Sequence, residues 1–266
     1  MTAPAWPHCD LPPSLSAERR GEIALLRLSR PEKRNAMNLD VVLGIEKFFD
    51  FLPDDVRAVV IHGQGDHFSA GLDLSELTER NASDSMHHSR HWHRAFEKIE
   101  FGRTPVVSVL HGAVVGGGLE LAASTHIRVA EKSAFYALPE GIRGIFVGGG
   151  GSVRISRLVG ASRMQEMMLT GRTYGAEEGL GFALSHYVVE NGEGLARGIA
   201  LAERAAKNTP MTNFAIVQAL PRIAQADPDA GLLMEAMISA IASSDPAATA
   251  RLIDFLEKRA AKVTHN

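Results

Sequence analysis

Residues 105–122, PVVSVLHGAVVGGGLELA, decide the fold of this chain. The stretch begins with β-branched residues that favour a buried strand, and a His-Gly pair then interrupts that strand. Three consecutive glycines, Gly116, Gly117 and Gly118, precede residues typical of a buried helix. Because they lack side chains, these glycines allow the backbone to come very close to another segment or to a ligand. The predicted helix begins there, and its unpaired N–H groups favour negative charge.

Gly117 and Glu120 are three residues apart, so the predicted helix places both on one face. A backbone N–H donor and a carboxylate then point into one space. This arrangement suits a reaction that develops negative charge on an oxygen while a proton moves nearby. The alternative for this stretch alone is close helix packing, with Glu120 as a solvated helix residue.

The composition indicates a soluble protein that does not bind nucleic acid. The 266 residues suffice for one large domain, or one domain with an appendage, and for a sizeable core. The net charge is −3, and no basic run suggests nucleic-acid binding. The single Cys9 excludes an internal disulfide and a cysteine-built metal site. No apolar run reaches the length of a membrane span, and residues 1–20 lack the apolar core of a signal peptide. We therefore expect a cytoplasmic protein in which residues 1–20 form a loose arm.

A second loop of small residues lies before a short predicted helix. The elements that precede this loop are a strand, a helix and a strand, predicted over 22–28, 40–52 and 56–62. The loop is Ser-Ala-Gly-Leu-Asp at 69–73, where backbone groups can again reach a ligand. A short helix over 73–79 makes the N–H of Leu72 another helix-start donor. The alternative is an ordinary strand-to-helix loop.

The polar segment that follows is rich in histidine. His87 and His91 have the i, i+4 spacing that can hold a metal on a helix, but the carboxylate of an H-E-x-x-H motif is absent. We favour a partly solvated helix over a metal site. Its packing residues are expected to be Trp92, Phe96 and Ile99. Because the segment is long and polar, residues 81–93 are expected to be a mobile cover that borders a pocket.

The second half of the chain adds a further glutamate and a glycine run. Glu140 follows an apolar segment that comes after a strand predicted over 126–130. The four glycines at 148–151 could cradle a phosphate, but the Lys-Ser/Thr of a P-loop is absent. Four helices are predicted at the end, over 193–208, 211–225, 230–243 and 246–262. The organisation is therefore an α/β core over 21–192 followed by a helical region over 193–266.

Five segments together resemble the crotonase, or enoyl-CoA hydratase/isomerase, superfamily from about Glu22 to the C-terminus. They are LSRPEKRNAMN, VRAVVIHGQGDHFSAGLDL, PVVSVLHGAVVGGGLELAAS, ALPEGIRG and GGGGSVRISRLVG. The resemblance implies an α/β fold, a spiral of ββα repeats, followed by C-terminal helices that trimerise. It also implies a homotrimer or, as a dimer of trimers, a homohexamer.

The resemblance further implies an acyl-CoA thioester substrate. The thioester oxygen is expected between the N–H groups of Leu72 and Gly117. Glu120 and Glu140 match the two catalytic glutamates of the family's hydratases, whereas its isomerases commonly keep only the second. The family's adenine-binding positions match the backbone at Ala36, Ala70 and Leu74. No metal or redox cofactor is required, because coenzyme A is part of the substrate.

These residues suit the hydration of an enoyl-CoA thioester. Adding water to the conjugated double bond gives the carbonyl oxygen enolate-like character, which two N–H donors stabilise. We assign the activation of water to Glu120 and the proton at Cα to Glu140, although the two roles could be exchanged or shared. One alternative is another reaction of the superfamily: isomerisation, retro-aldol cleavage or thioester hydrolysis. The other is a CoA-ester-binding scaffold or partner protein without turnover.

Two departures from the family pattern bear on the substrate. The chain has VGGGGSVR at 147–154, where the family often has Pro-Gly-x-Gly-Gly-Thr-Gln-Arg. Arg143 stands three residues after Glu140, where an apolar residue is usual. Arg143 either points into the pocket and favours a polar or carboxylated acyl group, or it faces a neighbouring loop.

Overall fold

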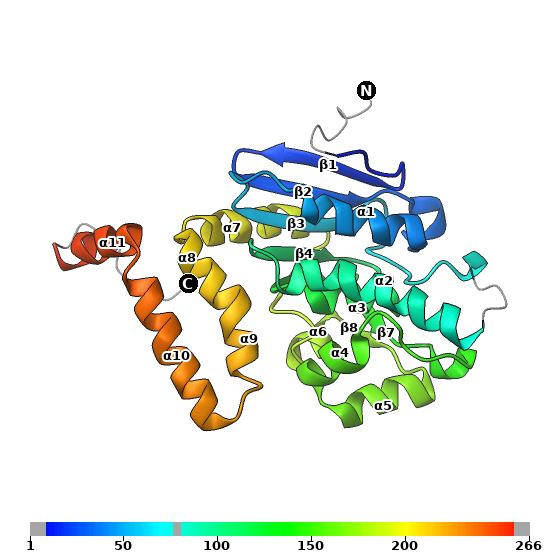
Figure 1. Cartoon of the computed structure of the whole chain (residues 1–266). Helices are drawn as coiled ribbons and strands as arrows, with labels where there is room; N and C mark the ends of the chain where they lie inside the picture. The colour runs from blue at the N-terminus through cyan, green and yellow to red at the C-terminus, as the bar shows by residue number, and fades with distance from the viewer. Residues whose placement is uncertain (1–8, 77–80, 258–266) are drawn as a thin grey trace.

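The computed structural model describes residues 9–76 and 81–257, and it shows an α/β body with a helical C-terminal extension (Figure 1). The larger sheet has six strands in the order β1-β2-β3-β4-β6-β9. They are β1 (Leu15–Arg20), β2 (Ile23–Leu28), β3 (Ala58–Gly63), β4 (Val106–Leu110), β6 (Ile127–Glu131) and β9 (Tyr187–Val189). All neighbouring pairs are parallel except β1 and β2, which pair antiparallel. The predicted α/β class is confirmed.

A smaller sheet has three strands in the order β5-β7-β8. They are β5 (Ala113–Val115), β7 (Phe135–Ala137) and β8 (Tyr174–Gly175). Strand β4 passes into β5 after a short break, and β6 passes into β7, so each strand pair contributes to both sheets. The first break lies at Gly112, where φ is +52° and a side chain would collide with the carbonyl of Asp66. Two strands and a following helix form the predicted ββα repeat.

Helices cover both faces of the larger sheet. On one face lie α1 (Leu39–Asp50), α2 (Ala82–Glu100) and α3 (Gly117–Ser124), and on the other lies α7 (Gly194–Ala206). The alternation along β3 shows the division: Val59 and Ile61 join the first core, while Val60 joins the core under α7. The helix predicted over 40–52 is α1, which begins where the Asn38 side chain accepts the N–H of Val41.

Beyond α7, the chain forms an extension that stands away from the sheets in Figure 1. Its elements are α8 (Pro210–Phe214), a π-helical turn (Ala215–Ala219), α9 (Leu220–Ile223), α10 (Pro228–Ser243) and α11 (Pro246–Leu256). These elements lie where the last three predicted helices are expected, and residues 258–262 of the last one lie outside the described residues. None of the helices within residues 9–76 and 81–257 is both long and apolar enough to cross a membrane.

The prediction of a loose arm over 1–20 is wrong for residues 15–20. They form β1, which pairs along its whole length with β2. Leu15 and Ala17 point inward and are buried, while Glu18, Arg19 and Arg20 are exposed. Only two of the six residues of β1 are apolar and point inward, so the alternation in its sequence is too weak to predict a strand. The segment is extended because it pairs with β2. Residues 1–8 of the predicted arm lie outside the described residues.

Candidate active site

A cavity of about 200 Å³ lies between α2, the start of α3 and the segment after β7. Its lining includes all four residues expected to carry the chemistry. The lining residues are Leu72, Ser85, His88, Ser89, Trp92, Gly117, Glu120, Glu140, Ile145, Phe146, Val147, Gly148 and Gly149. Residues 68 positions apart in the sequence, from Leu72 to Glu140, therefore meet at one cavity, as the ββα repeats require.

The backbone at Leu72 and the backbone at Gly117 pack against each other. A methyl group built on Gly71 would lie 2.9 Å from the nitrogen of Gly117, and one built on Gly117 would lie 3.4 Å from the nitrogen of Leu72. Only glycine fits at residue 71, where φ is also +89°. Within the described part of the chain, neither the Leu72 N–H nor the Gly117 N–H donates to an acceptor. Two unused donors therefore lie side by side at the cavity.

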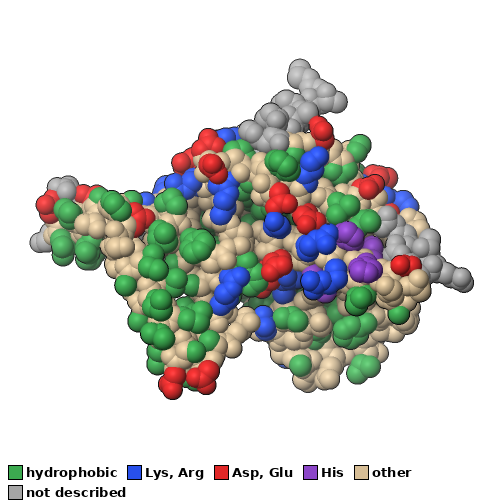
Figure 2. Space-filling model, viewed as in Figure 1, with side chains coloured by type: hydrophobic (Ala, Val, Ile, Leu, Met, Phe, Trp, Pro, Cys, Tyr) green, Lys and Arg blue, Asp and Glu red, His purple; other side chains and the backbone are tan. Residues whose placement is uncertain are grey.

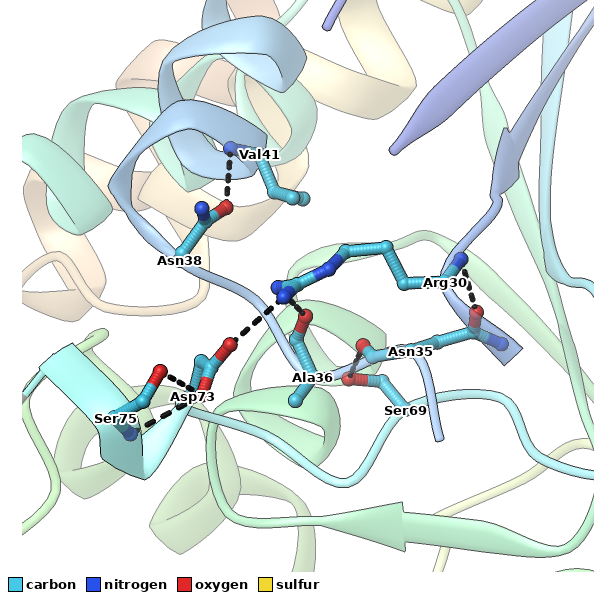
Figure 3. A network of polar contacts seen from close by, with 8 residues as sticks. All are labelled: Arg30, Asn35, Ala36, Asn38, Val41, Ser69, Asp73 and Ser75. Atoms are coloured by element: carbon cyan, nitrogen blue, oxygen red, sulfur yellow. Dashed lines mark hydrogen bonds and ion pairs between the residues drawn. The ribbon is translucent and has the colours of Figure 1, made fainter. Parts of the chain in front are cut away.

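A polar network fixes the loop that carries Leu72 (Figure 3). Met37 forms hydrogen bonds with the residues on either side of Leu72. Its N–H donates to the Gly71 carbonyl, and its carbonyl accepts the backbone N–H of Asp73. Asp73 is buried and accepts from the Ser75 hydroxyl and from the Arg30 guanidinium at 2.9 Å. These hydrogen bonds, with that of Ser75 first, lower the pKa of Asp73 to about 2. The sequence motifs contain these residues but did not reveal that they hold the site together.

The buried Asn35 side chain joins the same network. Its side-chain amide N–H groups donate to the carbonyls of Gln64 and His67, and the backbone carbonyl of Asn35 accepts the Ser69 hydroxyl at 2.8 Å. Ser69 in turn accepts the N–H of Gly71. The loop at 69–73 is therefore held by hydrogen bonds on both sides of its glycine, which fixes the position of the Leu72 backbone beside the cavity.

Glu120 lies in the first turn of α3 and is 3% exposed. Its Oε1 accepts the N–H of Gly149 at 2.8 Å and that of Gly151 at 2.7 Å. Burial raises the pKa of Glu120, while these two hydrogen bonds and the charge of Arg154 oppose that rise. The glycine run considered as a phosphate cradle thus binds a carboxylate of this chain. A methyl group on Gly151 would lie 2.8 Å from Oε1 of Glu120, so a glycine is needed there.

Arg154 holds the glycine run in place. It lies on α4 (Gly151–Val159) and donates from Nη1 to the Gly149 carbonyl at 2.9 Å. Its Nε donates to Glu100 at 2.6 Å in a mostly buried ion pair. Arg154 therefore anchors the peptide that directly follows the N–H donated by Gly149 to Glu120.

Glu140 reaches the cavity from the end of the segment after β7, and it is 7% exposed. Burial raises its pKa to about 7, and the nearby charge of Glu120 acts in the same direction. Gly116 makes room for the carboxyl, because a methyl group there would lie 2.6 Å from Oε1 of Glu140. Its Oε2 is buried and has no hydrogen-bond partner among the described residues. Glu140 therefore differs from Glu120, whose Oε1 has two donors.

The predicted CoA-binding positions lie beside the cavity rather than in its lining. Ala36 precedes Met37, which forms a bridge with Leu72. Ala70 and Leu74 each lie two residues from Leu72 along the chain, and the Leu74 side chain is 45% exposed. All three therefore lie on the two segments that meet at Leu72.

The structure separates the remaining predictions. The predicted cover is α2, which lines the cavity through Trp92 and the residues one and two turns before it. Its mobility stays a prediction.

The His91 ring lies 2.8 Å from the Arg94 guanidinium, and no group of metal-ligating side chains occurs within residues 9–76 and 81–257. Arg143 is exposed and does not line the cavity, although its charge lowers the pKa of Glu140. The short helix predicted over 73–79 is a 3-10 turn at Leu74–Glu76, and residues 77–80 lie outside the described residues.

A family model of enoyl-CoA hydratase/isomerase matches residues 18–266. This chain belongs to the enoyl-CoA hydratase/isomerase family. Within the family it is 31% identical to a short-chain-enoyl-CoA hydratase of Clostridium acetobutylicum, over 91% of this chain and 94% of the relative. It is 32% identical to a Bacillus subtilis protein described as a probable enoyl-CoA hydratase, over 89% of this chain and 93% of that protein.

Among solved structures, a Rhodopseudomonas palustris protein assigned to the enoyl-CoA hydratases is 54% identical, with a TM-score of 0.90. The match covers 94% of this chain and 97% of that one. Pseudomonas aeruginosa DspI is 29% identical, also with a TM-score of 0.90, over 97% and 99% of the two chains. The crotonase fold expected from the resemblance is thereby confirmed.

Proposed function

We propose that this chain adds water reversibly to the α,β double bond of an acyl-CoA thioester. The observation that carries the proposal is the meeting of two buried carboxylates, Glu120 and Glu140, with two unused N–H donors at one cavity. The family supports it, because the Clostridium relative is named an enoyl-CoA hydratase. The proposal needs no metal or redox cofactor, since water and the thioester supply all the reacting atoms.

The N–H groups of Leu72 and Gly117 are proposed to hold the thioester oxygen. As water adds at Cβ, electrons move toward the carbonyl, and its oxygen gains negative charge. Donors already in place stabilise that charge without reorganising, and removal of one such donor from other enzymes costs about 2.7–4 kcal/mol. The rigid loop around Asn35 and Asp73 keeps the first donor in place, and the start of α3 provides the second.

The two carboxyls are proposed to divide the proton transfers. The two N–H groups on Oε1 of Glu120 oppose the rise in its pKa that burial causes, and they leave Oε2 to accept a proton from water. Glu140, with a pKa near 7 and no donor on its buried Oε2 among the described residues, is suited to carry a proton at neutral pH. The hydroxide bonds to Cβ, Glu120 takes the proton released by water, and Glu140 gives its proton to Cα. Proton exchange within the pair or with solvent resets the site, and dehydration follows the reverse path.

Coenzyme A is proposed to lie along the segments that meet at Leu72, with its adenine near Ala36, Ala70 and Leu74. These positions flank the thioester site on the Leu72 side, whereas α2 and residues 145–149 enclose the other side. The acyl chain would then extend toward α2.

We also propose that the chain forms a homotrimer or a homohexamer through its extension. Apolar side chains on α10 and α11 are exposed in the single chain, and Figure 2 shows them gathered there. They include Leu232, Leu233, Met237, Ile241, Leu252, Ile253, Phe255 and Leu256. Exposure of so many large apolar residues on neighbouring helices favours burial against another chain. A cytoplasmic location stays a prediction.

The test is incubation of the full chain with a panel of 2-enoyl-CoA esters. Hydration predicts loss of the conjugated-thioester absorbance and a product heavier by one water. A β,γ-unsaturated product of unchanged mass would favour isomerisation, and free CoA would favour thioester hydrolysis. Tight binding of the esters without any product would favour the scaffold alternative.

A further inference from the structure

The cavity has two chemically different walls beyond the reacting groups. One wall is Ile145, Phe146 and Val147, which are apolar. The other is a face of α2, which we call the polar wall. It consists of Ser85, His88, Ser89 and Trp92. Their offsets of three, four and seven residues place them on one side of the helix.

Trp92 connects the polar wall to the thioester site. A methyl group built on Gly117 would lie 2.7 Å from Cζ3 and 3.0 Å from Cη2 of Trp92, so the six-membered ring packs against the backbone of Gly117. The indole N–H belongs to the five-membered ring and therefore lies farther from Gly117 than these two carbons. Packing against Phe96, with ring centroids 5.6 Å apart, holds this orientation.

The indole nitrogen is buried and has no hydrogen-bond partner within the described residues. Trp92 as a whole is 4% exposed. A buried donor without an acceptor is destabilising, so such a group in a binding cavity indicates a ligand that supplies one. Because an indole N–H can only donate, the missing partner is an acceptor such as an oxygen.

Two serine hydroxyls add further polar groups to the same wall of the cavity. The Ser89 hydroxyl lies across the cavity against Gly148, where a methyl group would come within 2.9 Å of it. Ser85 lies one turn earlier on the same face. A plain alkyl chain would remove water from these hydroxyls and offer them no hydrogen bond, which is unfavourable. An oxygen on the chain would satisfy them.

The charge of the cavity indicates that this oxygen is neutral. Glu120 and Glu140 already supply acidic groups, and none of the described lining residues is Lys or Arg, which leaves His88 as the one basic side chain among them. Arg143, the one cation considered from the sequence, is exposed and outside the lining. A carboxylate on the acyl chain would therefore be placed near two acidic groups without a Lys or Arg among the described lining residues to pair with it.

We infer that the polar wall makes the site selective for enoyl-CoA esters whose acyl chain carries a neutral oxygen, such as a hydroxyl or keto group, beyond Cβ. This inference rests on the proposed function, because the proposed thioester position defines which part of the acyl chain meets the polar wall. The indole N–H of Trp92 donates to that oxygen, and the Ser89 hydroxyl can donate or accept.

The experiment compares three six-carbon esters on the full chain: hex-2-enoyl-CoA, 6-hydroxyhex-2-enoyl-CoA and the 2-enoyl ester with a terminal carboxylate. We expect kcat/KM for the hydroxylated ester to exceed that for the alkyl ester about tenfold or more, and to exceed that for the carboxylated ester. Equal or faster hydration of the alkyl ester would overturn the inference. A carboxylated ester that is hydrated faster than the hydroxylated one would also overturn it.

Substitutions in the polar wall test whether its side chains cause the preference for the hydroxylated ester. Trp92→Phe keeps an aromatic ring but removes the N–H, so the ratio of the hydroxylated to the alkyl ester should fall about 3- to 10-fold. Ser89→Ala should lower the same ratio, and the double variant should bring it close to one. Ser162→Ala, on the exposed side of α5 (Ala161–Thr170), is the matched control and should leave the ratio unchanged. A preference that survives both wall substitutions would contradict our assignment.

A binding measurement separates this inference from the proposed function. Saturated hexanoyl-CoA and 6-hydroxyhexanoyl-CoA cannot be hydrated, and their affinities are measured by calorimetry on the wild type and on Trp92→Phe. Tighter binding of the hydroxylated analogue that is lost in Trp92→Phe supports the polar wall even if no enoyl ester is hydrated. Equal binding of both analogues to the wild type counts against the wall, whether or not hydration occurs.

Discussion

Glu120 and Glu140 carry the same functional group, but their hydrogen-bonding surroundings differ. Two N–H groups bind Oε1 of Glu120, whereas Oε2 of Glu140 is buried without a partner in the described residues. Resemblance to a family indicated both glutamates. The difference between them was not predictable, because the donors to Glu120 lie 29 and 31 residues away in the sequence. Only the folded chain brings these glycines to α3.

Replacing either glutamate by glutamine is expected to remove a proton transfer and keep the shape of the site. Glu120→Gln and Glu140→Gln should each lower kcat for hydration about 10²- to 10⁴-fold, while acyl-CoA binding persists. Steady-state kinetics and calorimetric binding on both variants make the measurement. Full hydration by Glu120→Gln would exclude our mechanism, and activity that depends on Glu140 alone would favour an isomerase.

The raised pKa of Glu140 predicts how the rate depends on pH. Hydration needs one proton on the pair, and Glu140 loses its proton as the pH rises through about 7. We therefore expect kcat/KM to fall above about pH 7. Dehydration of the product needs the same singly protonated pair, so its kcat/KM should fall over the same range. The residual activity of Glu140→Gln should lack this decline, and a wild-type rate that increases through pH 7 would contradict the assignment.

At the level of elements, local sequence patterns were sufficient to predict a helix or strand that is rich in apolar residues. They were insufficient for a strand whose formation depends on pairing with a neighbouring strand. The helix predicted over 40–52 is α1, since its buried residues recur at helical spacing. Strand β1 was missed, because β2 supplies most of the apolar contacts of the pair. The glycine run before α4 was noticed as an anion site. The anion is the carboxylate of Glu120, and no local pattern names a partner so far away in the chain.

The start of α4 is expected to control the position of Glu120. An alanine at Gly151 would place a methyl group 2.8 Å from Oε1 and from Cγ of Glu120, so Gly151→Ala should displace the carboxylate. We expect hydration to fall at least tenfold while acyl-CoA binding is retained, as measured by kinetics and calorimetry. Gly181→Ala in α6 (Ala176–Gly181) is the control, because open space surrounds that position. Normal turnover by Gly151→Ala would show that this contact does not set the geometry.

At the scale of the whole molecule, the α/β body and the helical extension differ in how their apolar residues are used. The body buries them in two cores, one on each face of the larger sheet. The extension leaves many of them exposed on α10 and α11. The helices themselves were predictable from their apolar patterns and prolines. What these exposed residues contact was not predictable, because the pattern of a single helix does not specify a partner surface.

The exposed apolar surface predicts self-association. Light scattering of the full chain should give a mass of three or six copies of the 28.7 kDa chain. Leu233→Glu on α10 should reduce that mass, because it places a charge in the proposed contact. Leu43→Glu on α1, which is exposed in the body, is the matched control and should leave the mass unchanged. A wild-type chain that remains a monomer at micromolar concentrations would contradict the proposal.

The two N–H groups at Leu72 and Gly117 belong to the main chain, and this has a consequence for how the protein can evolve. A substitution at Leu72 replaces the side chain but leaves its amide in place, unless the new residue is proline. The carboxyls and the polar wall are, by contrast, encoded in side chains that single codon changes can replace. Under the proposed mechanism, mutation can therefore vary the proton chemistry and the choice of acyl group separately, while descendants inherit the same backbone donors for polarising a carbonyl.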